Sequence, residues 1–156
     1  MKAIILYYSK SGVTEKLAKR IQADLGCDMI KIEPEKEYGN YAQAVTRVAK
    51  EKLTKVTPAF KTDIVDLSDY ELILVGYPVW YQKAPAFVTD YLAKCNTANK
   101  NIIPFATFGG TGVEWTLKSL KASLSSDAGV IYPFNWGMLK KDNYDSWVES
   151  IRNIMG

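Results

Sequence analysis

The sequence contains no histidine among its 156 residues. A Ser-His-Asp triad, a Cys-His nucleophile pair and a histidine-ligated zinc site are therefore all excluded, and no metal site is predicted. Cysteine is scarce as well, because the chain has only Cys27 and Cys95, which lie far apart in mostly apolar stretches. Since nothing else in the sequence indicates secretion, we interpret both as buried thiols and expect no disulfide.

Long apolar runs are also missing. No run approaches the ~18 residues that a membrane span requires, and the amino terminus leads straight into a strand-like segment with no cleavage-type site after it. We therefore expect a cytoplasmic protein that does not bind a membrane. The charge is nearly balanced, with 20 Lys and Arg against 17 Asp and Glu. The only local lysine cluster, at residues 50–55, is typical of a solvated helix face, so no nucleic-acid partner is predicted.

The composition that remains is that of an ordinary soluble chain, with 47% hydrophobic and 24% charged residues. The length fits one domain, residues 1–156, better than two thinly cored ones. Strand-like apolar runs alternate with helical patterns along this domain. The strands are predicted at residues 2–8, 28–33, 70–77, 101–108 and 129–134. Such alternation indicates an α/β fold, a parallel sheet with helices on both faces.

Helical spacing follows each predicted strand. Gly26 is expected to end the first helix as its C-cap, and one helix with loose ends is predicted within residues 36–62, before a loop around Pro58. Pro85 is expected in the first turn of the third helix. A fourth helix is predicted around Leu117, Leu120 and Leu124, and a closing helix over residues 144–154. Residues 135–137 are predicted to form the turn before that closing helix.

A turn rich in hydroxyl groups, residues 9–14, links the first strand to the first helix. It reads Ser-Lys-Ser-Gly-Val-Thr, so three hydroxyl groups and a glycine stand where a helix N-terminus favours an anion. A monophosphate ester would suit this turn. By spacing alone, the turn fits equally well a plain helix cap at Ser11 or Thr14, and both interpretations stay open. The chain contains neither a P-loop, nor a G-x-G-x-x-G first turn, nor a cysteine-x5-arginine phosphatase loop.

Three motifs in sequence order resemble those of the flavodoxin family. The family's phosphate loop, S/T-x-S/T-G-x-T, is matched by Ser9, Ser11, Gly12 and Thr14. The third strand ends in G-x-P-x-W, matched by Gly76, Pro78 and Trp80. The fourth ends in F-x-T followed by glycines, matched by Phe105, Thr107, Gly109, Gly110 and Gly112. The resemblance covers essentially the whole chain. It implies a flavodoxin-like three-layer α/β/α sandwich, a five-stranded parallel sheet in the order 2-1-3-4-5, and FMN as cofactor.

The resemblance also implies which residues hold FMN. A flavin ring is flat and largely apolar with a polar pyrimidine edge, so it suits aromatic walls and accessible backbone amides. Trp80 or Tyr81 is expected to lie against the ring, although such aromatics also fit a sheet end or a protein interface. The glycines of the third loop are expected to let the backbone approach the pyrimidine, although alone they also fit a plain turn. The predicted cofactor-binding residues are Ser9, Lys10, Ser11, Gly12, Val13, Thr14, Pro78, Val79, Trp80, Tyr81, Thr107, Phe108, Gly109, Gly110 and Gly112.

The charge pattern departs from that of the usually acidic flavodoxins. Many of them place a glycine-aspartate pair beside the flavin's N5, whereas this chain has Pro78-Val79 before its tryptophan. Asp90 is the only acid between residues 72 and 113, while Lys10 and Lys83 lie in or beside the predicted site. Because nearby ammonium groups favour an anionic reduced flavin, we expect a less negative potential for its final one-electron reduction than in acidic flavodoxins.

Three functions remain open at this point. The first is an FMN-containing electron carrier that works between a reductase and an acceptor protein and needs no catalytic side chain. The second is an NAD(P)H-dependent FMN or quinone oxidoreductase on the same fold, with a small quinone or flavin as substrate. The third is an interaction module that binds no flavin and uses its exposed aromatic residues as a contact surface. A monomer or weak dimer is expected in each case.

Overall fold

The computed structural model describes residues 1–54, 59–110 and 112–156. Within these residues the elements follow one another as β1 (Ala3–Tyr7), α1 (Val13–Leu25), β2 (Asp28–Lys31), α2 (Tyr41–Thr54), β3 (Leu72–Pro78), α3 (Ala86–Lys94), β4 (Asn101–Phe108), a 3-10 helix η1 (Val113–Thr116), α4 (Leu117–Ala122), β5 (Gly129–Val130), β6 (Phe134–Gly137) and α5 (Tyr144–Met155). No helix in these ranges is both long and apolar enough to cross a membrane.

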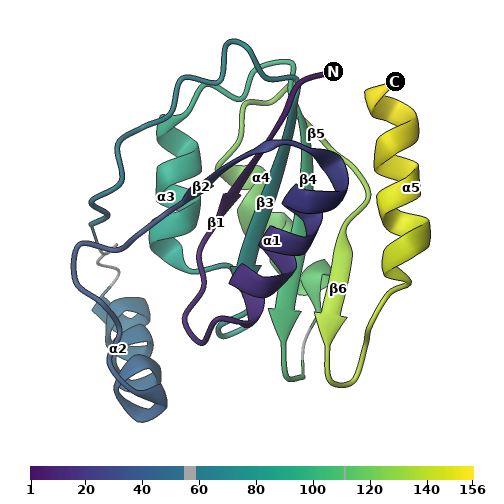
Figure 1. Cartoon of the computed structure of the whole chain (residues 1–156). Helices are drawn as coiled ribbons and strands as arrows, with labels where there is room; N and C mark the ends of the chain where they lie inside the picture. Colours follow the sequence, from purple (N-terminus) through teal and green to yellow (C-terminus); the bar gives the residue numbers. More distant parts are fainter. Residues whose placement is uncertain (55–58, 111) are drawn as a thin grey trace.

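The strands form one parallel sheet in the order β2-β1-β3-β4-β5, and β6 pairs with β4 farther along the same edge (Figure 1). The predicted order 2-1-3-4-5 and the α/β class are confirmed. The helices α1 and α5 cover one face of the sheet, and α3 and α4 cover the other. This is the three-layer arrangement that the resemblance implied.

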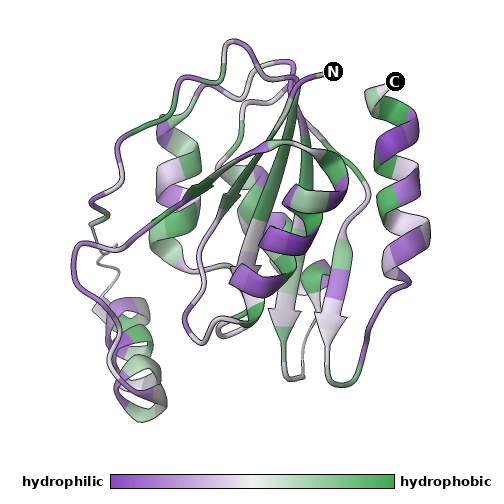
Figure 2. Ribbon diagram, in the orientation of Figure 1, coloured by the Kyte–Doolittle hydropathy of each residue, from purple (hydrophilic) through white to green (hydrophobic). Residues whose placement is uncertain are grey.

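Alternating side chains of the central strands supply both cores. In β1, Ile4 and Leu6 face the layer that contains α3, whereas Ala3 and Ile5 face α1 and α5. The run of four apolar residues that begins at Leu72 is fully buried, because β3 lies mid-sheet and is covered on both faces. Figure 2 shows this concentration of hydrophobic residues in the strands, with hydrophilic residues on the outer sides of the helices.

The fifth strand is not the continuous segment that the sequence predicted. It divides into β5 and β6, and residues 135–137, predicted as a turn, are strand residues that pair with the end of β4. The break lies at Tyr132, whose φ is 47°, and at Pro133, which has no N–H for the ladder. The indole Nε1 of Trp147 donates a hydrogen bond of 2.8 Å to the Tyr132 carbonyl. The chain therefore leaves and rejoins the sheet.

Several predicted boundaries are also corrected. Pro85 is the N-cap residue of α3, with a ψ of 135°, and does not lie in the first turn. Among the described residues of the predicted 36–62, the second helix covers Tyr41–Thr54; the loop expected around Pro58 lies outside the described residues, as does the end of the 50–55 lysine cluster. The fourth helix ends before Leu124. The C-cap at Gly26 is confirmed, since its N–H donates to the Gln22 carbonyl.

The two cysteines do not form a disulfide. Cys95 is buried at the end of α3, and Cys27 is half-buried beside β2. Burial raises the pKa of each thiol to about 11, so both remain protonated at neutral pH. The prediction of a buried thiol is confirmed for Cys95, whereas Cys27 is only half-buried.

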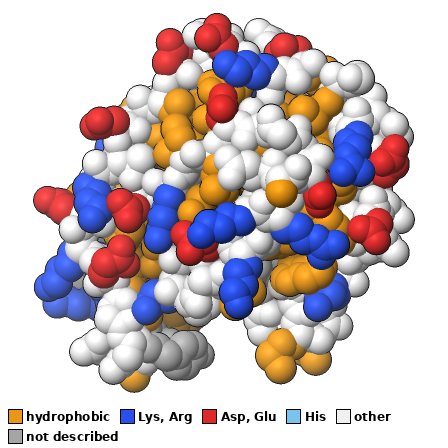
Figure 3. Space-filling view, in the orientation of Figure 1, with side chains coloured by type: hydrophobic (Ala, Val, Ile, Leu, Met, Phe, Trp, Pro, Cys, Tyr) orange, Lys and Arg blue, Asp and Glu red, His pale blue; other side chains and the backbone are white. Residues whose placement is uncertain are grey.

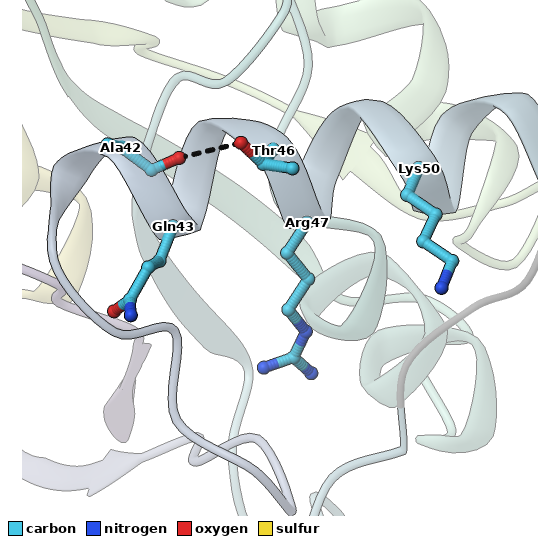
Figure 4. Close-up of a pocket in the computed structure, with 5 residues that line it drawn as sticks. All are labelled: Ala42, Gln43, Thr46, Arg47 and Lys50. Carbon is cyan, nitrogen blue, oxygen red and sulfur yellow. Dashed lines mark hydrogen bonds between the residues drawn. The ribbon is translucent and has the colours of Figure 1, made fainter.

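A shallow hollow lies on the outer side of α2, and its lining side chains all come from that helix (Figure 4). Its volume is about 400 Å³ and its lining residues are Ala42, Gln43, Thr46, Arg47 and Lys50. The Thr46 hydroxyl donates a hydrogen bond of 3.0 Å to the Ala42 carbonyl within the helix. None of the predicted FMN-binding residues lines this hollow.

Candidate functional site

Three loops leave the same edge of the sheet. In the parallel register Tyr7 of β1 lies opposite Gly76 of β3, and Pro78 lies opposite Thr107 of β4. The pairing continues one step beyond β3, because the Val79 N–H donates a hydrogen bond of 3.0 Å to the Thr107 carbonyl. The loops after β1, β3 and β4 therefore begin at one level, at the lower end of the sheet in Figure 1. Ligands of open parallel sheets bind at this carboxyl edge.

The first loop ends in a helix terminus that no side chain caps. The N-cap residue is Gly12, whose φ of 92° lies in the left-handed region that favours glycine. The Gly12 N–H donates a hydrogen bond of 3.1 Å to Ser9 Oγ, so Ser9 shapes the loop and does not cap the helix. Neither Ser11 nor Thr14 caps α1, so the capping alternative is wrong. The first N–H groups of α1 keep their capacity to bind an anion.

A hydrogen bond joins the first loop to the third. The Thr14 and Thr107 hydroxyl groups lie 2.7 Å apart, and both residues are buried. A buried hydroxyl pair costs little only when its members bond each other. The contact therefore fixes the first turn of α1 against the end of β4. Two loops that are distant in sequence are thus joined directly.

The acidic residue in the first turn of α1 is held away from the loop by its own partners. Glu15 Oε1 accepts a hydrogen bond of 2.9 Å from the Tyr7 hydroxyl, and the Lys19 and Lys31 ammonium groups lie 3.9 Å from its carboxylate. The Tyr7 hydrogen bond and these lysines hold the pKa of the Glu15 carboxyl below its ordinary value. Because these partners balance the charge of the Glu15 carboxylate, it repels an anion at the N-terminus of α1 less strongly.

The second loop makes a tight turn at Trp80. The Trp80 and Lys83 backbones exchange two hydrogen bonds of 2.8 and 3.0 Å. Between them, Tyr81 and Gln82 have φ values of 49° and 62°. Two consecutive left-handed residues define a type I′ turn, which normally carries Asn and Gly. Tyrosine and glutamine therefore hold a strained backbone here, as often happens at functional sites.

The Trp80 ring packs inward on other aromatic residues while staying half-exposed. Its centroid lies 4.9 Å from that of Tyr38 and 5.7 Å from that of Tyr8, both in edge-to-face geometry. The Tyr8 hydroxyl is fully buried and has no hydrogen-bond partner among the described residues. The Tyr38 hydroxyl donates to Glu51 of α2 at 3.0 Å. The wall at Trp80 is therefore rigid and aromatic, as a flavin ring requires.

The third loop has open space at Gly109 and Gly110 and is tightly packed at Gly112. A Cβ placed on Gly109 or Gly110 would meet no atom within 4 Å. At Gly112 a Cβ would lie 2.5 Å from Asn135 Oδ1, so only glycine fits beside that side chain. Next to it, the buried Val113 N–H donates to Asn135 Oδ1 at 2.8 Å. Asn135 of β6 thus fixes the end of the loop, next to the open backbone of Gly109 and Gly110.

The charges at this edge differ from those expected from sequence neighbours alone. Lys10 and Lys83 form no ion pair with any residue that the structure describes. Glu114 and Asp142, which lie outside the segment inspected in the sequence, converge on Asn135 at 2.9 Å each. Burial of Glu114 opposes its ionisation, but hydrogen bonds from Lys140 and Asn135 hold the pKa of its carboxyl below the ordinary value. Two carboxylates therefore lie beneath the third loop.

Exposed apolar side chains border the same edge. Met138 and Leu139, at the turn after β6, are 90% and 81% exposed, and Trp115 of η1 is 61% exposed. The Met138 N–H donates to the Phe108 carbonyl, so this turn lies beside the third loop. Figure 3 shows hydrophobic side chains at the end of the molecule where β6 ends, with Lys and Arg side chains above them.

The comparisons with known proteins agree with this geometry. The family model described as flavodoxin matches residues 2–151. The chain belongs to the flavodoxin family. Among curated proteins no significant match to this flavodoxin-family chain is found.

Solved structures share the fold of this family member. A candidate flavoprotein from Bacteroides eggerthii is 23% identical, with a TM-score of 0.79 over 98% of this chain and 96% of that chain. A flavoprotein from Lactobacillus acidophilus, solved in complex with FMN, is 22% identical, with a TM-score of 0.74 over 86% of this chain and 92% of that chain. Oxidised flavodoxin 2 from Bacillus cereus is 18% identical, with a TM-score of 0.55 over 99% and 94% of the two chains.

The structure brings the predicted residues of this flavodoxin-family chain to one edge of the sheet. Those of the first loop lie at the start of α1, those of the second at the turn after β3, and those of the third beyond β4. Sequence reasoning missed Asn135, Glu114 and Asp142, which support the third loop. Asn135 lies in the segment predicted to connect the last strand to the closing helix, and its neighbours Phe134 and Trp136 give no signal of this role.

Proposed function

We propose that this flavodoxin-family chain binds FMN at the three loops and carries electrons between protein partners. The observation that supports this best is the Thr14–Thr107 hydrogen bond, which joins a helix N-terminus without a side-chain cap to an accessible glycine backbone. A phosphate ester and a flat heterocycle need these two features side by side. The chain offers both at one edge of its sheet.

The fit to FMN follows from open backbone positions. The Cβ directions of Gly12, Gly109 and Gly110 all point into empty space, so a ligand can approach the backbone at each of them. Residues 9–14 would hold the phosphate through the first N–H groups of α1 and the hydroxyl groups of Ser9, Ser11 and Thr14. The exposed Ser11 side chain can turn toward a phosphate at little cost.

The other two loops would hold the ring. Trp80 and Tyr81 would form an aromatic wall, and Pro78 and Val79 an apolar support, while Thr107, Phe108 and the third-loop glycines would face the pyrimidine edge with their backbone. Bound FMN would supply the redox chemistry. The protein would set the potential through its amides and charges, and Lys10 and Lys83 would favour negative charge on the reduced ring. No side chain needs to act as an acid or base.

The proposed partners are a reductase and an acceptor protein. The exposed Met138, Leu139 and Trp115 beside the third loop provide an apolar contact surface, which suits brief protein contacts at the edge of the ring. The NAD(P)H-dependent oxidoreductase remains the alternative that the experiment must separate, because it would share the fold and the cofactor.

The experiment uses the whole purified chain reconstituted with FMN. We expect a yellow protein with a flavin spectrum that NADPH alone does not bleach under anaerobic conditions. After reduction with dithionite, it should pass electrons to cytochrome c as a one-electron acceptor. Direct bleaching by NADPH would contradict the electron-carrier function and support the NAD(P)H-dependent oxidoreductase. Failure to retain any flavin would contradict both functions and leave an interaction module.

A further inference from the structure

A buried amide on β6 supports the third loop. Asn135 is 1% exposed, and each end of its side chain is hydrogen-bonded. Its Oδ1 accepts from the Val113 N–H at 2.8 Å, and its Nδ2 donates to Glu114 Oε1 and Asp142 Oδ2 at 2.9 Å each. Because a buried amide is costly unless its polar atoms are bonded, these contacts fix Asn135 in one orientation.

Asn135 also determines the space at the end of the loop. A Cβ on Gly112 would lie 2.5 Å from Asn135 Oδ1 and 2.6 Å from Glu114 Oε2. The φ of Gly112 is −88°, which any residue can adopt, so space and not backbone conformation requires glycine there. The loop is therefore fixed at this end by Asn135 and at its beginning by the Thr14–Thr107 bond.

Charged groups strengthen this contact. Asp142 Oδ2 accepts a second hydrogen bond, of 2.8 Å, from the Asn135 backbone N–H, and Lys140 pairs with Glu114. Hydrogen bonds from Nδ2 to two carboxylates polarise the amide and make Oδ1 a better acceptor for Val113. The two carboxylates thereby act on the loop through one neutral side chain.

We propose that Asn135 is a positioning residue that sets the redox potential of the bound flavin by fixing the backbone of Gly112 and Val113 at the end of the third loop. The inference rests on the proposed function, in which this backbone faces the pyrimidine edge. Asn135 itself lies behind the loop and acts through the Val113 N–H. Fixed amide dipoles stabilise the negative charge of the reduced ring more than the neutral oxidised ring. A relaxed loop should therefore lose affinity mainly for the reduced flavin.

The test compares the whole wild-type chain with its Asn135→Ala variant. The flavin affinity and the redox potential of the bound flavin are measured for both. We expect the variant's preference for fully reduced over one-electron-reduced FMN to fall about tenfold, which lowers the potential of the final one-electron reduction by about 59 mV. Any loss of affinity for the oxidised flavin should be equal for FMN and for riboflavin, because the phosphate loop is untouched.

The control is Thr97→Ala at the opposite end of the sheet. Thr97 is 1% exposed, and its hydroxyl accepts a hydrogen bond from the Ser125 N–H at 2.8 Å, so this variant also loses a buried polar contact. Its stability should fall, but its potential and flavin affinities should stay at the wild-type values. A general loss of stability therefore cannot imitate the expected result.

Gly112→Ala tests the same contact from the loop and decides the matter if Asn135→Ala does not fold. The added Cβ should displace Asn135 and lower the potential in the same direction. In the double variant the Gly112→Ala effect should shrink, because the missing side chain leaves room for the Cβ. Wild-type potentials in the folded variants would overturn the proposed role of Asn135 but leave the proposed function of the chain intact. A wild-type protein that binds no FMN would overturn the proposed function and this inference with it.

Discussion

The hydroxyl groups of Thr14 and Thr107 lie 2.7 Å apart, although 93 positions separate the two residues in the sequence. One residue belongs to the first turn of α1 and the other to the end of β4. A phosphate held at the first loop and a ring held at the third would thus be positioned relative to each other by the protein itself. The proposed site of this flavodoxin-family chain would therefore depend on that link as well as on its motifs.

The phosphate loop should distinguish FMN from riboflavin. Ser11→Ala and Thr14→Ala should each weaken FMN binding far more than riboflavin binding, because only FMN carries the phosphate. Thr14→Ala should also lower the free energy of unfolding by about 1 kcal/mol or more, since it leaves the buried Thr107 hydroxyl without its partner. Fluorescence titrations with both flavins measure the first effect, and urea unfolding measures the second. Thr14→Ser keeps the hydroxyl and serves as the control. Equal losses for both ligands would contradict the loop assignment.

A glycine at position 82 should stabilise the turn that follows Trp80. Gln82 is exposed and has a φ of 62°, so Gln82→Gly should raise the free energy of unfolding by about 1 kcal/mol by removing a left-handed Cβ. Ser126→Gly, at an exposed loop position without a positive φ, should lower it through the larger entropy of the unfolded chain. Urea midpoints of the two variants check this difference in sign. A destabilised Gln82→Gly would mean that its side chain makes a contact worth more than the strain.

The Tyr7–Glu15 pair should make stability depend on pH in the acid range. The Tyr7 hydrogen bond lowers the folded-state pKa of Glu15 below its ordinary value of 4.5, so the pair contributes fully above that value. As pH falls through the lowered pKa, the unfolded chain takes up the proton first and stability is lost. Glu15→Gln and Tyr7→Phe should both show a shallower decline in urea midpoint between about pH 5 and pH 3. A Tyr7→Phe profile as steep as the wild type would contradict this cause.

Lys10 and Lys83, which form no ion pair with any described residue, should raise the flavin potential. Lys10→Gln and Lys83→Gln should each make the final one-electron potential more negative by roughly 10–40 mV at low salt, because an exposed ammonium group contributes up to about 1 kcal/mol. Lys94→Gln, on α3 at the other end of the sheet, is the control. Redox titrations at low and high salt measure the effect, which screening should reduce. An unchanged potential in both variants would remove the lysines from the electrostatic account.

The sequence predicted those parts of the fold that depend on local patterns. The continuous apolar run from Leu72 indicated a central strand, and Gly26 marked a helix end, because burial and a left-handed cap leave direct traces in the sequence. The strand order came instead from the family resemblance. The break at Tyr132 was missed, because Pro133 is its only local signal and the indole that donates to the Tyr132 carbonyl belongs to Trp147 of α5.

The site was predictable only where its residues lie in the motifs. Residues 9–14 carry their chemistry in sequence, whereas the support from Asn135 depends on β6 pairing with β4 and leaves no local pattern. Asp142 is brought beneath the third loop by that pairing, whereas Glu114 follows the loop directly in η1, just outside the segment inspected in the sequence. Charge counted along that segment therefore underestimated the carboxylates close to the third loop.

The most direct test of the account is a fluorescence titration of the flavin-free protein with FMN, followed by riboflavin, in phosphate-free buffer. The account predicts saturable FMN binding at micromolar concentrations or below and weaker binding of riboflavin, with added inorganic phosphate reducing the difference. Riboflavin binding as tight as that of FMN, or no uptake of either, would contradict a phosphate site at the N-terminus of α1.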